Sequence, residues 1–83
     1  MAERTRLESY SNGIDNARYF IENVPDADLV QQAKNARMWM GMFAEELARQ
    51  ILAAGHGWDT VGEVFQLTAK EAERKFAIFV DSK

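Results

Sequence analysis

The sequence predicts an all-α protein, with an N-terminal antiparallel helical hairpin over about residues 5–54 and a C-terminal helix-turn-helix over about residues 58–80. Two observations predict this fold. Apolar residues recur at steps of three and four along most of the chain, which places them on one face of each helix. Helix-breaking residues, chiefly Pro25, Gly55 and Gly57, separate these stripes. At 83 residues, the chain is expected to form a single domain, residues 1–83.

The first helix is expected over about residues 5–23. Its apolar stripe consists of Leu7, Tyr10, Ile14, Ala17, Ile21 and Val24. Gly13 weakens the centre of the helix, because glycine has a low helix propensity. Pro25 ends it, because the residue before a proline is pushed out of the helical region.

The second helix is expected over about residues 27–54. Asp26 or Asp28 caps its start, and Asp28 with Gln31 has the spacing of a capping box. Its apolar stripe consists of Leu29, Ala33, Ala36, Met40, Phe43, Leu47 and Ile51. This spacing resembles a short coiled-coil seam, so the stripe is expected to pack antiparallel against the first helix.

Three large apolar residues of the second helix, Met38, Trp39 and Met42, lie off this stripe, beside Gly41. Methionine and tryptophan provide large, adaptable contacts, so an exposed cluster of them would suit a protein partner. The alternative is that they cover the helix-turn-helix within the same chain. Both interpretations remain open at the level of the sequence.

The last third of the chain predicts two short helices joined by a tight turn. Residues expected to point into the angle between these helices are Val61, Phe65, Leu67, Ala72 and Phe76. Gly62 would allow the two helices to approach closely. Thr68 can cap the second of them, with Glu71 completing a capping box. The run 76–80, Phe-Ala-Ile-Phe-Val, is also compatible with a strand.

Residues 55–76 resemble the helix-turn-helix of small bacterial and phage DNA-binding domains, including those like the last region of sigma factors. The matching positions are His56-Gly57-Trp58, Val61-Gly62, Val64-Phe65, Gln66-Leu67-Thr68, Ala72 and Lys75-Phe76, in register without a gap. Such domains usually have glycine where this chain has Gln66, so a looser turn is expected here. The resemblance implies that the second helix of the motif enters a DNA groove.

The residues expected to meet DNA are Thr68, Ala69, Lys70, Glu73, Arg74 and Lys75. The charge of the chain works against a strong grip on phosphates, because the net charge is -3 and residues 56–83 hold four basic and five acidic side chains. Glu71 could also pair with Lys75 at i,i+4. The basic side chains therefore have two open interpretations, phosphate contact and an ordinary solvated helix face.

The sequence gives little support for catalysis, metal binding or nucleotide binding. The chain has no cysteine, and its single histidine, His56, lies between two glycines. Neither a catalytic triad nor a metal site is expected from such a residue. The Gly55-His56-Gly57 loop lacks the later glycine and lysine of nucleotide-binding motifs. We expect no enzyme activity, no metal, no cofactor, no membrane span and a cytoplasmic location.

Two functions remain. The first is a small DNA-binding regulator, working as a homodimer built on the N-terminal helices, and its size is compatible with a phage or mobile-element origin. The second is an acidic helical interaction module that binds a protein, for example to inhibit a host factor. A dimer is expected because so short a chain buries little apolar surface by itself.

Overall fold

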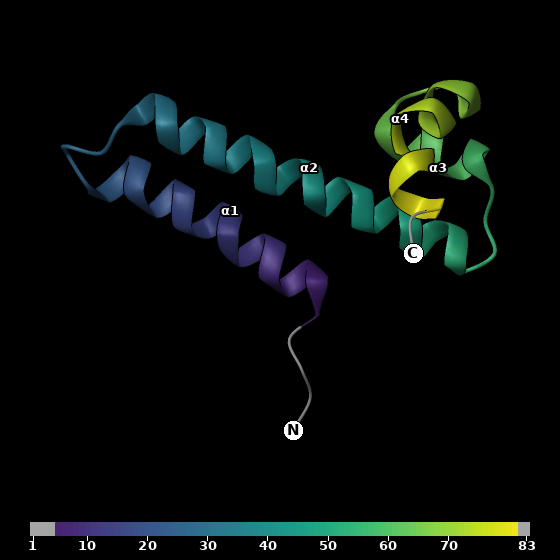
Figure 1. Cartoon of the computed structure of the whole chain (residues 1–83), viewed down its shortest axis with the longest axis horizontal. Helices are drawn as coiled ribbons and strands as arrows, with labels where there is room; N and C mark the ends of the chain where they lie inside the picture. The colour runs from purple at the N-terminus through teal and green to yellow at the C-terminus, as the bar shows by residue number, and fades with distance from the viewer. Residues whose placement is uncertain (1–4, 82–83) are drawn as a thin grey trace. The chain divides into compact units, whose positions relative to one another are not determined.

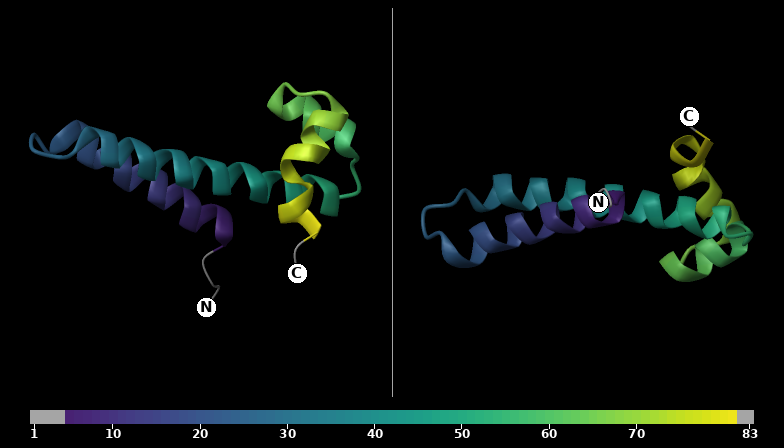
Figure 2. Two further views of the ribbon diagram at one scale, coloured as in Figure 1. Left: turned by 45° about the horizontal axis from the view of Figure 1, so that its top comes forward. Right: turned by 90° about the horizontal axis from the view of Figure 1, so that it is seen from below.

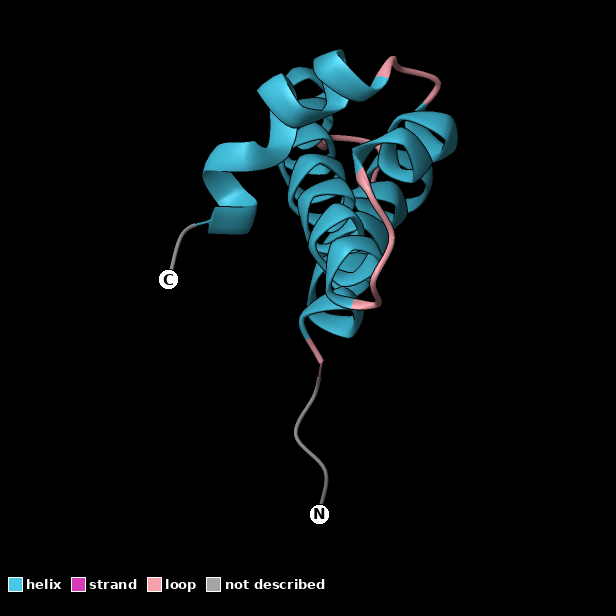
Figure 3. Cartoon of the chain, turned by 90° about the vertical axis from the view of Figure 1, so that its right-hand side faces the viewer, coloured by secondary structure: helices cyan, strands magenta, loops and turns pink. Residues whose placement is uncertain are grey.

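The computed structural model describes residues 5–81. This part of the chain contains four α-helices and no strand (Figures 1 and 3). The helices are α1 (Arg6–Asn23), α2 (Leu29–Ala53), α3 (Trp58–Phe65) and α4 (Ala69–Asp81). The predicted all-α class is confirmed. The run 76–80, which was also compatible with a strand, is helical because it continues α4.

The chain divides into two compact units, with the boundary between Ala44 and Glu45, inside α2. The N-terminal unit contains α1 and the first part of α2, and the C-terminal unit contains the last turns of α2 with α3 and α4. The predicted division at residues 54–58 assigned those last turns to the hairpin. The apolar stripe residues in the last turns of α2 lie in the same compact unit as α3 and α4.

Local signals set the ends of α1. Thr5 begins the helix with a capping box, in which the Glu8 amide donates to Thr5 Oγ1 at 3.1 Å and the Thr5 amide donates to Glu8 Oε1 at 2.9 Å. The helix ends at Asn23, and Val24 is extended, as expected for a residue before Pro25. The predicted role of Pro25 is confirmed.

Asp28 starts α2, which decides between the two predicted capping residues. Its Oδ1 accepts hydrogen bonds from the amides of Val30 and Gln31, at 3.1 and 3.2 Å. After the helix, Gly55 adopts a φ of 101°, a conformation that favours glycine. The expected termination of α2 by this glycine agrees with the structure.

In the N-terminal unit, α1 and residues 29–44 of α2 run antiparallel and side by side (Figure 2). The indole ring of Trp39 lies directly on Gly13, so that a Cβ atom at this position would overlap the ring. The Tyr10 and Trp39 ring centroids are 6.1 Å apart, and Ala17 is buried. Gly13 therefore provides the flat surface that receives Trp39.

This contact corrects the predicted seam of the hairpin. Trp39 was expected to lie off the seam, but it packs against α1. Leu29 and Met40 were expected to face α1, but they are 61% and 50% exposed. The physical reason is that Gly13 has no side chain, which leaves room on α1 for a large ring. The face of α2 that carries Trp39 therefore packs against α1.

Candidate nucleic-acid interface

The C-terminal unit has a small apolar core between α3 and α4. Val61 and Ala72 are fully buried and Phe76 is nearly so. The rings of Phe65 and Phe76 are tilted against each other, with centroids 5.0 Å apart. These residues belong to the set predicted to point into the angle between the two helices, and that part of the prediction is confirmed.

The turn between α3 and α4 is held by a left-handed residue. Gln66 has φ 61° and ψ 43°. Its amide donates to the carbonyl of Glu63 at 3.4 Å, and the amide of Leu67 donates to the carbonyl of Gly62 at 2.7 Å. This pair of bonds is the Schellman ending of a helix. The looser turn expected from a glutamine is not observed, because these two backbone hydrogen bonds close the turn.

Gly62 lets the turn fold back onto α3. A Cβ atom at this position would overlap the carbonyl oxygen of Leu67 and lie 3.0 Å from the carbonyl carbon and oxygen of Thr68. These neighbours are backbone atoms, which cannot move aside as the end of a side chain can. The predicted close approach at Gly62 is thus real, and it is made by the turn that leads into α4.

Thr68 and Glu71 form the predicted capping box at the start of α4. The Glu71 amide donates to Thr68 Oγ1 at 3.0 Å, and the Thr68 amide donates to Glu71 Oε1 at 2.8 Å. The hydrogen bond from the Thr68 backbone, followed by that with its side chain, lowers the pKa of Glu71 below its ordinary value of 4.5, and Arg74 lowers it further. Glu71 is therefore engaged with the helix start and Arg74.

The lowered pKa of Glu71 predicts a loss of stability in acid. The folded chain holds the carboxylate charged more strongly than the unfolded chain does, so its contribution is complete above the unfolded value near 4.5 and is lost as the pH falls below it. We expect the difference in free energy of unfolding between the natural chain and Glu71→Gln to shrink from neutral pH to about pH 3.5. Urea titrations followed by circular dichroism measure this difference. A constant difference would assign the effect to the hydrogen bonds and not to the charge.

Two basic side chains share the outward face of α4. Lys70 and Arg74 are one helical turn apart, opposite the buried Ala72 and Phe76, and both are exposed. Thr68 and Ala69 are exposed at the start of the helix, and Glu73 is exposed beside the basic pair. Five of the six predicted DNA-contacting residues thus lie on the accessible side of α4 or at its start.

Lys75 lies on another flank of the helix. Burial raises the pKa of Glu45 of α2 above its ordinary value, and the charge of Lys75 offsets part of this rise. The ammonium nitrogen of Lys75 is also 5.8 Å from the centre of the Phe76 ring. Sequence reasoning missed Glu45 because it comes from another helix, far away in the chain. Because Glu45 is distant from Lys75 in the sequence, no local pattern indicates that the two interact.

The predicted partner-binding cluster of α2 is split by the structure. Met38 is 51% exposed, whereas Trp39 and Met42 are half-buried. Trp39 fills the contact with Gly13. Of the three residues, Met38 presents the largest accessible fraction to a partner.

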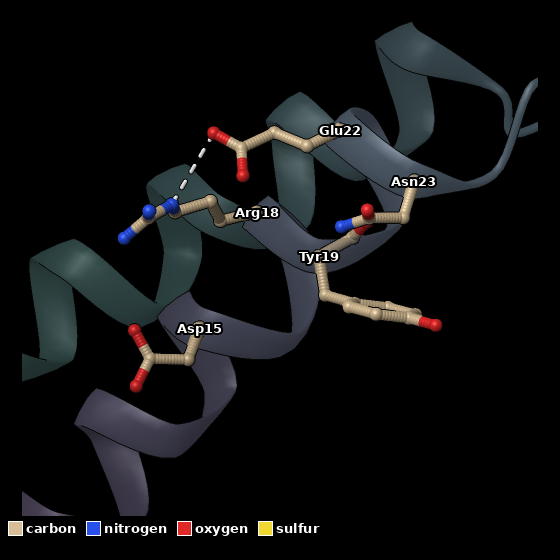
Figure 4. Close-up of a pocket in the computed structure, with 5 residues that line it drawn as sticks. All are labelled: Asp15, Arg18, Tyr19, Glu22 and Asn23. Atoms are coloured by element: carbon tan, nitrogen blue, oxygen red, sulfur yellow. Dashed lines mark hydrogen bonds and ion pairs between the residues drawn. The ribbon is translucent and has the colours of Figure 1, made fainter.

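A shallow hollow lies along one face of α1 (Figure 4). It has a volume of about 310 Å³ and is lined by Asp15, Arg18, Tyr19, Glu22 and Asn23. Arg18 and Glu22 form an ion pair at 3.3 Å across its rim. Within residues 5–81, no cluster of side chains is suited to hold a metal ion, and no helix is long and apolar enough to cross a membrane.

Comparison with known proteins adds no assignment: no protein-family model, no curated protein and no solved structure matches this chain. The functional proposal therefore rests on the geometry of α3, the turn and α4.

Proposed function

We propose that the protein is a small DNA-binding helix-turn-helix regulator that places α4 in a DNA groove. The observation that carries the proposal is the turn. Gly62, the left-handed Gln66 and the capping box of Thr68 hold α4 against α3 with its first turn exposed. In helix-turn-helix proteins the first residues of the second helix reach the base edges.

The side chains on that face support phosphate contact. Lys70 and Arg74 project from the same side of α4, so both can meet the backbone of one groove. Thr68 and Ala69 stand at the end of the helix that would approach the bases. Lys75 contributes less, because it projects from another flank of α4. The proposed function includes the cytoplasmic location that was expected from the sequence.

The proposal predicts a change in the salt dependence of DNA binding. Lys70→Ala and Arg74→Ala should each weaken binding and reduce the slope of log affinity against log salt by about one. Fluorescence anisotropy with a labelled duplex, from about 50 to 200 mM salt, measures the slope. Glu73→Gln should strengthen binding, because it removes a negative charge beside the basic pair.

The matched control is Lys34→Ala, which removes an exposed lysine from the N-terminal unit. This variant should keep the natural slope. Equal slopes for the natural chain, the Lys70 variant and the Arg74 variant would refute the proposal.

Two observations favour the interaction module as a second candidate. The C-terminal unit holds seven acidic and five basic side chains over residues 45–83. It also exposes large apolar side chains on its helices, with Val64 54%, Ile78 76% and Phe79 47% exposed. Ile78 continues the outward face of Lys70 and Arg74 by one more turn. If α4 binds a protein, Ile78→Asp should remove binding while the two basic variants retain it.

A further inference from the structure

Two hollows lie along the N-terminal hairpin. One side of the α1–α2 contact carries Asn16, Gln32 and Asn35, which line a hollow together with Phe20. The other side carries Ile21, Val24 and Leu29, which line a second hollow near the hairpin turn together with Glu22 and Asn23. Positions three or four residues apart share one face of a helix, so this second side continues along both helices.

We define the apolar face of the hairpin by six residues. They are Leu7, Ile14 and Ile21 on α1 and Leu29, Ala33 and Met40 on α2. Ile21, Met40 and Leu29 are 41%, 50% and 61% exposed. Among residues 5–44 the structure buries only Ala17. The hairpin therefore leaves large apolar side chains exposed.

We propose that the apolar face is covered by the same face of a second copy of this chain, in a four-helix bundle where α1 of each copy lies against α2 of the other. A standard stable interface takes about 800 Å² from each partner, so such an interface would have to use the length of both helices. The face has an apolar stripe from each helix, so it is complementary to itself around a twofold axis. This proposal does not depend on DNA binding.

Charge selects the pairing of helices within the bundle. The rim of the face carries Asp15 and Glu22 on α1, and Arg37 on α2. Pairing α2 with its own copy would bring basic side chains together, whereas pairing α1 with α2 brings opposite charges together. Arg18 lies on the α1 rim as well, where it is paired with Glu22. In this pairing Asp15 of one copy faces Arg37 of the other.

Two methionines of α2 provide a matched test. Met38 and Met40 are 51% and 50% exposed, but they lie on opposite sides of the helix, and only Met40 belongs to the apolar face. We expect the full-length chain to sediment as a dimer at micromolar concentration. Met40→Glu should raise the dimer dissociation constant at least about tenfold, because it buries a charge in the interface, and Met38→Glu should leave it unchanged. Leu29→Glu is a second disrupting variant, at a site that is 61% exposed in the single chain.

Circular dichroism checks that each variant keeps its helices, so that a change of mass reports assembly and not unfolding. The pairing is tested with Asp15→Arg and Arg37→Asp, each of which should weaken the dimer several-fold, while the double variant restores it. A monomeric natural chain would overturn the proposal. An equal response to the Met38 and Met40 variants would overturn the choice of face. Failure of the double variant to restore the dimer would overturn the pairing of α1 with α2.

Discussion

Gly62→Ala should destabilise the C-terminal unit by about 2–3 kcal/mol, because it forces a methyl group into a packed backbone. The new Cβ atom would overlap the Leu67 carbonyl oxygen and press on the carbonyl group of Thr68. The turn must then open, which pulls the capping box away from the start of α4. Urea unfolding followed by helical circular dichroism gives the free energy directly.

The control for this prediction is Gly41→Ala. Gly41 lies inside α2, and a Cβ atom there would meet nothing within 4 Å. Alanine favours a helix by about 1 kcal/mol over glycine, so this variant should be more stable than the natural chain. Opposite signs for the two substitutions are expected. The same sign for both would mean that Gly62 is not held against the turn.

Phe76→Ala should cost about 3–4 kcal/mol, which is the range for removing a buried aromatic ring. Phe76 is 2% exposed and packs on Phe65 with ring centroids 5.0 Å apart. Its removal leaves a cavity in a core of few residues, so α3 and α4 lose their main contact. The midpoint of thermal or urea unfolding measures the effect.

Phe79→Ala is the matched comparison, since it removes the same side chain one turn later in α4. Phe79 is 47% exposed, so less apolar surface returns to water and no closed cavity forms. We expect a cost of about 1 kcal/mol or less. Comparable losses for the two variants would show that the core does not centre on Phe76.

The sequence predicted the features that depend on neighbours along the chain. Pro25 ends α1, Asp28, one of the two expected capping residues, begins α2, and Thr68 with Glu71 caps α4, because each signal acts over a few residues. The inward positions Val61 and Phe76 followed from helical spacing in the same way. Periodicity identifies which residues share a face, and it succeeded where both helices of a pair are short and joined by a tight turn.

Features that depend on distant residues could not be predicted. The rotation of α2 in the hairpin is set by the fit of Trp39 onto Gly13, and a stripe pattern does not reveal which flank of a broad apolar surface meets its neighbour. Lys75 was grouped with Lys70 and Arg74 because all three lie in one basic stretch, whereas in the structure its charge acts on Glu45 of another helix. At Gln66 the residue type suggested a weak turn, but two backbone hydrogen bonds stabilise it.

The two tryptophans of the chain fall one in each compact unit. Trp39 is half-buried beside Tyr10 in the hairpin, and Trp58 is half-buried as the first residue of α3. Each unit thus carries its own intrinsic fluorophore. With Trp58→Phe the emission follows the hairpin alone, and with Trp39→Phe it follows the C-terminal helices alone. Coincident unfolding curves would identify one cooperative transition across the shared helix, and separate curves would identify two.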